Sequence, residues 1–163
     1  MANRRELITM TDEEADAFLG EQKTVICATN GKDGWPHLMP LWFVTRPTGP
    51  EGATELWAWT FAKSQKVKNL ERDPRTTLQV EAGEEYHLLR GLMLECDTEV
   101  IHDTDTVLEL GLEIFARYGG DPAGEVAEDV KAMVRKQAEK RAGLRFVERR
   151  RVSWDHRKLG GTY

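Results

Sequence analysis

Short runs in which apolar residues alternate with polar ones, or cluster without a break, recur along the chain and predict β-strands. The six predicted strands cover residues 24–29, 35–45, 55–61, 76–82, 86–101 and 144–156. An Asn/Gly-rich turn at 30–34 joins the first two, so we expect a hairpin there. Pro36 and Pro40 interrupt the second run, which indicates an edge strand, a bulge or N–H groups left out of the sheet. Gly91 marks an expected bend or bulge in the fifth run.

Four further segments have the pattern of helices, at residues 9–20, 63–74, 104–118 and 122–141. Thr11 and Glu14 form a capping box in the first, and Ser64 is placed to cap the second. The whole pattern predicts a mainly β fold with flanking helices, built around a six-stranded antiparallel barrel. We expect one domain over residues 1–163, with its core in 24–101 and 145–155 and helices 104–118 and 122–141 packed outside.

Composition narrows the class of protein. The chain has 163 residues, 31% of them charged, and a net charge of −5. The acidic balance argues against a nucleic-acid partner. No apolar run approaches the roughly 20 residues that cross a bilayer. The N-terminus is too polar for a signal peptide, so we expect no membrane partner and a cytoplasmic location.

Side chains with chemistry of their own are scattered. Cys27 and Cys96 stand alone in strand-like runs, and we expect both to be buried structural thiols. No metal site is predicted, because the histidines at 37, 87, 102 and 156 lack the spacing of ligands. No nucleophile motif is found either, so the sequence leaves the catalytic residues unknown.

A lysine-rich segment follows the aromatic strand 55–61 and opens the helix 63–74. The first N–H groups of a helix are unpaired and carry partial positive charge. With the Ser64 hydroxyl and the amines of Lys63 and Lys66, they would form a cradle for an anion such as phosphate. The alternative is a solvated helix face that buries only Val67 and Leu70.

Alternation places Trp57, Trp59 and Phe61 on one face of their strand. There they would either belong to the core or border a flat aromatic ligand. Pro40 leaves one ladder bond unmade and would help to open a slot for such a ligand.

Three stretches in a fixed order resemble the pyridoxamine 5′-phosphate oxidase-like superfamily of FMN-binding split barrels. They read NGKDGWPHLMPLWFV, ELWAWTFAKSQKVKNLERDPRTTLQVE and EEYHLLRGLMLECDTEV, and VSWDHRKLGG is a weaker echo. More narrowly, they resemble the B group of its flavin- and deazaflavin (F420)-dependent oxidoreductases. The resemblance covers about residues 24–101 and implies that the six-stranded barrel is split.

The resemblance also implies FMN or the deazaflavin coenzyme F420, bound at the interface of a homodimer. Lys63, Ser64 and Lys66 would grip the cofactor phosphate. Arg90 would face the cofactor or the partner subunit, and Trp154 would cover the ring from the last strand. The ring would lie along the second and third strands, against a further set of residues: Met39, Pro40, Leu41, Trp42 and Thr60.

Coenzyme F420 is the favoured cofactor, because the chain ends in RKLGGTY and lacks the arginine framing of true pyridoxamine phosphate oxidases. The implied activity is hydride transfer to an unsaturated small molecule, with the cofactor doing the chemistry. Its acidic tail would lie along the basic residues 149–151, 157 and 158. His37, beside the ring, would be structural or would donate a proton.

Three alternatives stay open. One is an FMN-dependent oxidoreductase similar to pyridoxamine 5′-phosphate oxidase. Another is a haem- or flavin-binding protein without turnover, since the superfamily also includes haem binders. The third is a nucleic-acid-binding barrel, which would show salt-sensitive binding to single strands.

Overall fold

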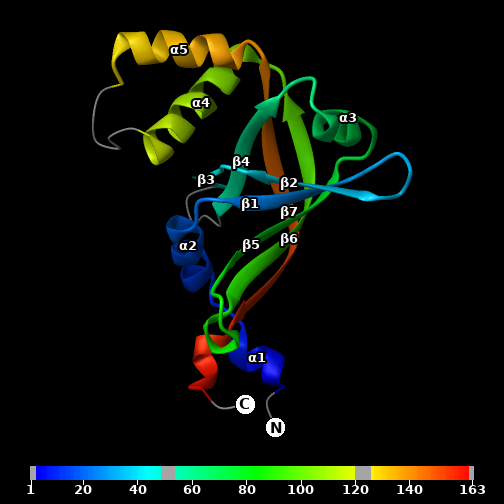
Figure 1. Ribbon diagram of the computed structural model, residues 1–163, viewed down its shortest axis with the longest axis vertical. Coiled ribbons are helices and arrows are strands. Elements are labelled where there is room, and N and C mark those ends of the chain that lie inside the picture. The colour runs from blue at the N-terminus through cyan, green and yellow to red at the C-terminus, as the bar shows by residue number, and fades with distance from the viewer. Residues whose placement is uncertain (1–2, 49–53, 120–125, 162–163) are drawn as a thin grey trace.

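The computed structural model describes residues 3–48, 54–119 and 126–161. Seven antiparallel strands form one sheet in the order β2-β1-β5-β6-β7-β4-β3. The sheet is strongly curved, so that the β1–β2 hairpin runs across the long strands (Figure 1). The strands are β1 Val25–Asn30, β2 Pro36–Leu41, β3 Val44–Pro47, β4 Thr54–Phe61, β5 Arg75–Ala82, β6 Arg90–Ile101 and β7 Arg141–Asp155.

The mainly β architecture with flanking helices is confirmed, but the prediction of six strands is wrong. The apolar run 35–45 forms two strands rather than one. β2 pairs with β1, and β3 pairs with β4 at the opposite edge of the sheet. Between them the backbone N–H of Phe43 donates to the hydroxyl of Tyr118 at 2.9 Å, which replaces a ladder bond where the chain changes edge.

Alternation along the strands fills one main core. Inward-facing residues of β1, β4, β5, β6 and β7 pack together with Phe18 and Leu19 from the helix α2 Asp12–Glu21. A second, smaller cluster lies on the outer face of β4, where Trp57 and Trp59 pack with Leu110 of the helix that follows β6. The aromatic side chains of β4 therefore share one face, as predicted, and two of them, Trp57 and Trp59, are partly buried against this second cluster.

Three of the predicted helices are observed close to their expected bounds: α2 Asp12–Glu21, α3 Gln65–Arg72 and α4 Thr104–Tyr118. The capping box of Thr11 and Glu14 is present at the start of α2. α5 spans Glu128–Ala138, and the predicted start of this helix at residue 122 lies outside the described residues. Its predicted end at 141 is wrong, because Arg141 already pairs with Phe61 as the first residue of β7.

Three short elements lie at the lower end of the molecule (Figure 1). They are the helix α1 Arg4–Ile8 and the 3₁₀ turns η1 Tyr86–Leu88 and η2 His156–Leu159. None of them was predicted. The predicted strand 86–101 consequently begins at Arg90, and its irregularity falls between Glu95 and Cys96 rather than at Gly91.

None of the described helices is both long enough and apolar enough to span a membrane.

Candidate functional site

Helix α3 is fixed at the end of β4 by its cap and by a buried amide. The Ser64 hydroxyl accepts a hydrogen bond from the Val67 N–H at 3.4 Å, so Ser64 is the N-cap that the sequence predicts. Asn69 is fully buried, and its side-chain amide donates to the Thr29 hydroxyl on β1 at 3.0 Å. These contacts hold α3 against β1, directly after the end of β4.

Lys66 is the unusual member of the lysine-rich segment, because only 5% of it is exposed. Its amine donates to the Thr60 hydroxyl at 3.0 Å, and no carboxylate pairs with it among the described residues. Burial lowers the pKa of Lys66, and the nearby Cys27 thiol opposes that shift. By contrast Lys63 is exposed, so the reading of a solvated helix face fits Lys63 and fails for Lys66.

The strand β2 is a sheet edge with apolar side chains facing solvent. It pairs with β1 on one side, and no other strand among residues 3–48, 54–119 and 126–161 pairs with its second side. Free backbone N–H and C=O groups on such an edge are available to a ligand or a partner. Leu38 and Met39 are 55% and 43% exposed, Pro40 is exposed, and Leu41 is half-buried.

An opening in the sheet separates β2 from the end of β4. β3 pairs with β4 only from Thr54 to Trp57, so the segment 58–61 has β7 on one side and no strand on the other within the described chain. β2 and β4 approach one another across this gap. Thr60 is buried beside it and accepts from Lys66.

Trp42 lies just past β2 and is 56% exposed. Its ring stacks on that of Tyr118, with centroids 4.5 Å apart and planes 7° from parallel. One face of the indole is thus occupied by the chain itself. Eight predicted site residues therefore lie on or just after β2, on the end of β4 or at the start of α3: Met39, Pro40, Leu41, Trp42, Thr60, Lys63, Ser64 and Lys66.

Arg90 and Trp154 lie elsewhere in the same chain. They occupy one end of the β6–β7 pair, where Trp154 packs over Gly91. The Arg90 guanidinium pairs with Glu21 at 2.7 Å. The carbonyl of Pro74, just after α3, accepts a hydrogen bond from the backbone N–H of Thr98 on β6. Thr98 is eight residues along β6 from Arg90. At about 3.3 Å per residue, Arg90 is roughly 26 Å from that point.

The basic residues near the C-terminus are neutralised by acids of the chain. They therefore do not form the free basic surface that was expected to bind an acidic cofactor tail. The pairs are Arg149–Asp97, Arg150–Glu95, Arg151–Glu148, Arg157–Asp155 and Lys158–Glu14, at 2.5–2.8 Å.

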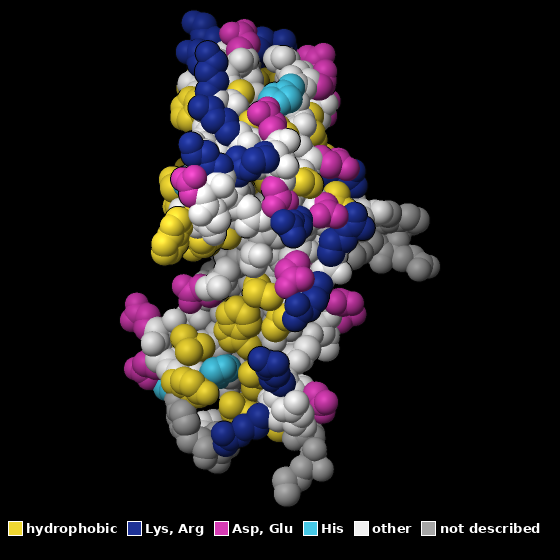
Figure 2. Space-filling model, turned by 90° about the vertical axis from the view of Figure 1, so that its right-hand side faces the viewer, with side chains coloured by type: hydrophobic (Ala, Val, Ile, Leu, Met, Phe, Trp, Pro, Cys, Tyr) yellow, Lys and Arg dark blue, Asp and Glu magenta, His cyan; other side chains and the backbone are white. Residues whose placement is uncertain are grey.

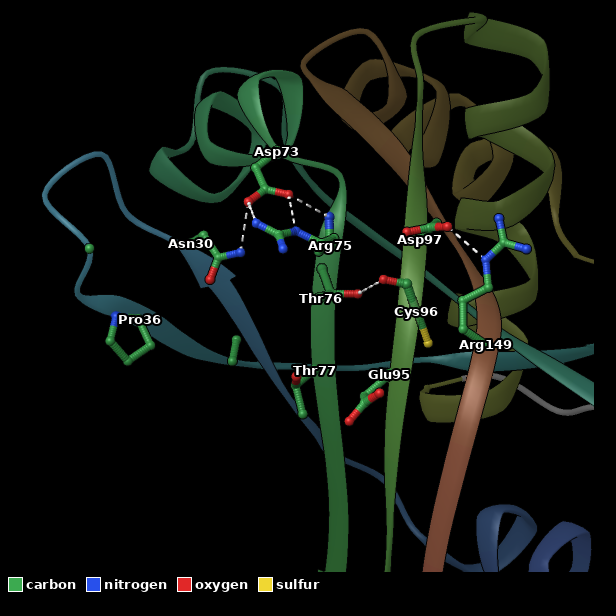
Figure 3. Close-up of a pocket in the computed structure, with 12 residues that line it drawn as sticks. Asn30, Pro36, Asp73, Arg75, Thr76, Thr77, Glu95, Cys96, Asp97 and Arg149 are labelled. Carbon is green, nitrogen blue, oxygen red and sulfur yellow. Dashed lines mark hydrogen bonds and ion pairs between the residues drawn. The ribbon is translucent and has the colours of Figure 1, made fainter.

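A pocket of about 660 Å³ lies on the outer face of β1, β5, β6 and β7 and contains none of the predicted site residues (Figure 3). Its charged side chains are all paired: Asp73 accepts from Arg75 and Asn30, Asp97 pairs with Arg149, and Glu95 pairs with Arg150 outside the pocket. The Arg75 and Asn30 bonds hold the pKa of Asp73 well below its usual range. The pocket therefore offers no uncompensated charge to a ligand.

A smaller pocket of about 340 Å³ lies between the β1–β2 turn and α3. Gln65 and Asn69 line it from the helix, and His37 lines it from β2. The Nδ1 atom of His37 is buried and has no partner in the described part of the chain. Sequence reasoning missed Gln65, whose side chain donates to Asn69 at 2.9 Å, because a lone glutamine carries no motif.

The two cysteines are buried, as predicted, and they are not joined in a disulfide. Burial raises the pKa of both thiols to about 12. No group of three or more His, Cys, Asp or Glu side chains within the described ranges is arranged to hold a metal ion.

Comparison with known proteins places this geometry in a family. Residues 11–150 match the pyridoxamine 5′-phosphate oxidase family. A conserved hypothetical protein from Mycobacterium tuberculosis has 36% sequence identity, with 99% of this chain and 95% of that chain covered and a TM-score of 0.84. No curated protein matches the chain.

Two more distant structures share the fold. An F420 reductase has 20% identity and a TM-score of 0.60, over 83% of this chain and 94% of that one. The haem storage protein HutZ from Vibrio cholerae has 16% identity and a TM-score of 0.64, over 86% and 93%. Because the family match covers residues 11–150 and the mycobacterial protein is 36% identical over 99% of this chain, the chain belongs to the pyridoxamine 5′-phosphate oxidase family.

Proposed function

We propose that the chain is an oxidoreductase that binds a flavin-type cofactor through its phosphate at the start of α3. The observation that carries the proposal is the Lys66 amine, which is buried with one neutral partner and no carboxylate in the described chain. A buried cation without a counter-charge is costly. A bound phosphate would supply that charge, and the unpaired first N–H groups of α3 would add hydrogen bonds.

The residues present fit such a group. Lys63 and Ser64 precede Lys66 in the turn that begins α3. The free edge of β2 borders the opening between β2 and the end of β4. The backbone of residues 39–42 would line the ring, with Thr60 at its edge. A bound flavin or deazaflavin supplies the hydride chemistry, and the chain orients it and excludes water.

Coenzyme F420 is our favoured cofactor, and the substrate is an unsaturated small molecule. The likeness to an F420 reductase supports the fold that this proposal needs, at 20% identity. FMN is the alternative, because it presents a ring and a phosphate to the same side chains.

We also infer that the site is completed by a second copy of the chain. Trp35 is 81% exposed, and Leu38, Met39 and Trp42 follow it along the β2 edge with large exposed fractions. An apolar edge of this kind favours burial in an interface. Arg90 and Trp154, which lie at the far end of the β6–β7 pair from the contact between Thr98 and Pro74, would reach the cofactor from the partner subunit.

Titration with each cofactor tests the proposal, with fluorescence quenching as the signal. Lys66→Met is expected to weaken binding of FMN or F420 by about 10- to 100-fold, the range of a lost charge-assisted hydrogen bond. The matched control is Lys68→Met, an exposed lysine on the same helix, which is expected to leave affinity unchanged. Equal affinities of the wild type and the Lys66 variant for both cofactors would refute the phosphate assignment, and a Soret band on adding haem without flavin binding would favour a haem carrier.

A further inference from the structure

Arg141 is a second cation without a counter-charge, and it lies on the other face of the sheet from Lys66. It opens β7 opposite Phe61. Its guanidinium carbon lies 4.5 Å from the centroid of the Trp59 ring and 4.6 Å from that of Phe61. Its Nε atom is buried, and its side chain has no hydrogen-bond acceptor or ion pair within the described residues.

Other arginines that lie against aromatic rings in the described chain have an oxygen partner that Arg141 lacks. Each combines a ring contact, which fixes the guanidinium plane, with an oxygen that takes its N–H groups. The pairs are Arg46 with Glu113, Arg90 with Glu21, Arg145 with Glu55, and Arg117 with the carbonyls of residues 19 and 22. Arg141 has the ring contacts and lacks the oxygen, and burial lowers its pKa.

Two exposed lysines lie near Arg141 in sequence or in the fold. The Ala62 N–H donates to the Lys140 carbonyl at 3.0 Å, which brings the turn carrying Lys63 to the start of β7. Lys63 and Lys140 are exposed and have no ion pair in the described chain. Figure 2 shows Lys and Arg side chains gathered over the upper part of the molecule.

We propose that Arg141, with Lys63 and Lys140 beside it, binds an oxyanion of a small ligand, either a carboxylate or a phosphate group. Stacking on Trp59 and Phe61 orients the guanidinium in advance, so that its terminal N–H groups make two parallel hydrogen bonds to one oxyanion. Thr60 and Phe61 point to opposite faces of β4, so the Arg141 guanidinium lies apart from the Lys66 amine, and Lys63 is the residue that the two proposed sites share.

Nuclear magnetic resonance of the full chain tests the site through the Arg141 Nε–H signal, assigned by its absence in Arg141→Met. The protein is titrated with citrate and, separately, with inorganic phosphate, at constant ionic strength. We expect a saturable shift of this signal and at least a 10-fold weaker affinity in Arg141→Met. The control is Arg150→Gln, which removes an arginine of the same strand that is already paired with Glu95, and its affinity is expected to stay within twofold.

The two titrations distinguish the sources of the oxyanion. Tighter binding of citrate assigns the site to carboxylates, and tighter binding of phosphate assigns it to phosphate esters. An Arg141 signal that moves with neither anion, or an affinity equal in the wild type and Arg141→Met, overturns the proposal. If Arg141→Met does not fold, the wild-type signal alone decides, with Arg141→Lys used for assignment. Because Lys66→Met leaves this site intact, failure here and failure of the proposed function are separate results.

Discussion

The amine of Lys66 lies 3.0 Å from the hydroxyl of Thr60, and this single neutral contact is the only hydrogen bond of the amine in the described chain. A charged group that is 5% exposed ordinarily has an acidic partner. No such partner exists among the described residues at the opening between β2 and β4, where we propose that a cofactor phosphate binds. The pair therefore links the cost of burying this cation to its proposed use in binding a phosphate.

Removing this charge is expected to stabilise the protein without cofactor. In Lys66→Met the stem of the side chain keeps its packing, while the cost of burying an unpaired cation disappears. The free energy of unfolding, measured by urea denaturation, should rise by about 1 kcal/mol or more. Lys68→Met should change it by less than about 0.5 kcal/mol, because Lys68 is exposed. A destabilised Lys66→Met variant would argue for a structural role of the amine.

Affinity for the cofactor phosphate should fall at alkaline pH. The folded pKa of Lys66 lies below its ordinary value of about 10.4, so the amine loses its proton earlier than an exposed lysine does. Phosphate binding needs the charged amine, and the charge of the phosphate itself no longer changes above about pH 7.5. Fluorescence titrations from about pH 7.5 to 10 should therefore show a rising dissociation constant.

The same shift has the opposite consequence for the protein without cofactor. Between the lowered pKa and about 10.4 the unfolded chain binds the proton that the folded chain has lost, so stability from this group rises with pH. Both trends should vanish in Lys66→Met. Persistence of the pH-dependent affinity in that variant would assign it to another group.

Helix α4 depends on a glycine that admits an aromatic ring. A Cβ atom at Gly111 would lie 2.5 Å from the Trp59 ring, so Gly111→Ala should displace α4 and lower the free energy of unfolding by about 1–3 kcal/mol. Gly20→Ala is the matched control in α2, since a Cβ atom there meets nothing within 4 Å. Thermal unfolding should show that control to be neutral or stabilised by up to about 1 kcal/mol.

The two thiols should be unreactive in the folded protein. Burial raises the pKa of Cys27 and Cys96 to about 12, so at pH 8 almost no thiolate is present. Mass spectrometry after brief treatment with iodoacetamide should show an unmodified native chain and two modified thiols in denaturant. Rapid native labelling would show that β1 or β6 opens far more readily than its packing implies.

The faces of the strands and the caps of the helices follow from local sequence. Period-two alternation put Trp57 and Trp59 on one face, and Thr11 and Ser64 were identified as caps from their own neighbours. Such features depend on a few adjacent residues, so the sequence is sufficient to predict them. The break between β2 and β3 within the run 35–45 was not predicted, because the apolar pattern continues through it. At the break the Phe43 N–H donates to the hydroxyl of Tyr118, a residue distant in sequence.

The sequence by itself determined the antiparallel β class, the helices that follow the caps Thr11 and Ser64, and the burial of the two cysteines. It also showed the lysine-rich turn, which the family resemblance associates with a phosphate. Only the tertiary structure decided which cations are free. Arg149, Arg150 and Arg151 of β7 looked available and are paired with Asp97, Glu95 and Glu148. By contrast, Lys66 and Arg141 are not paired within the described chain. The reason is physical: alternation fixes which face a side chain occupies, but its counter-charge comes from strand register and helix packing between residues far apart in the sequence.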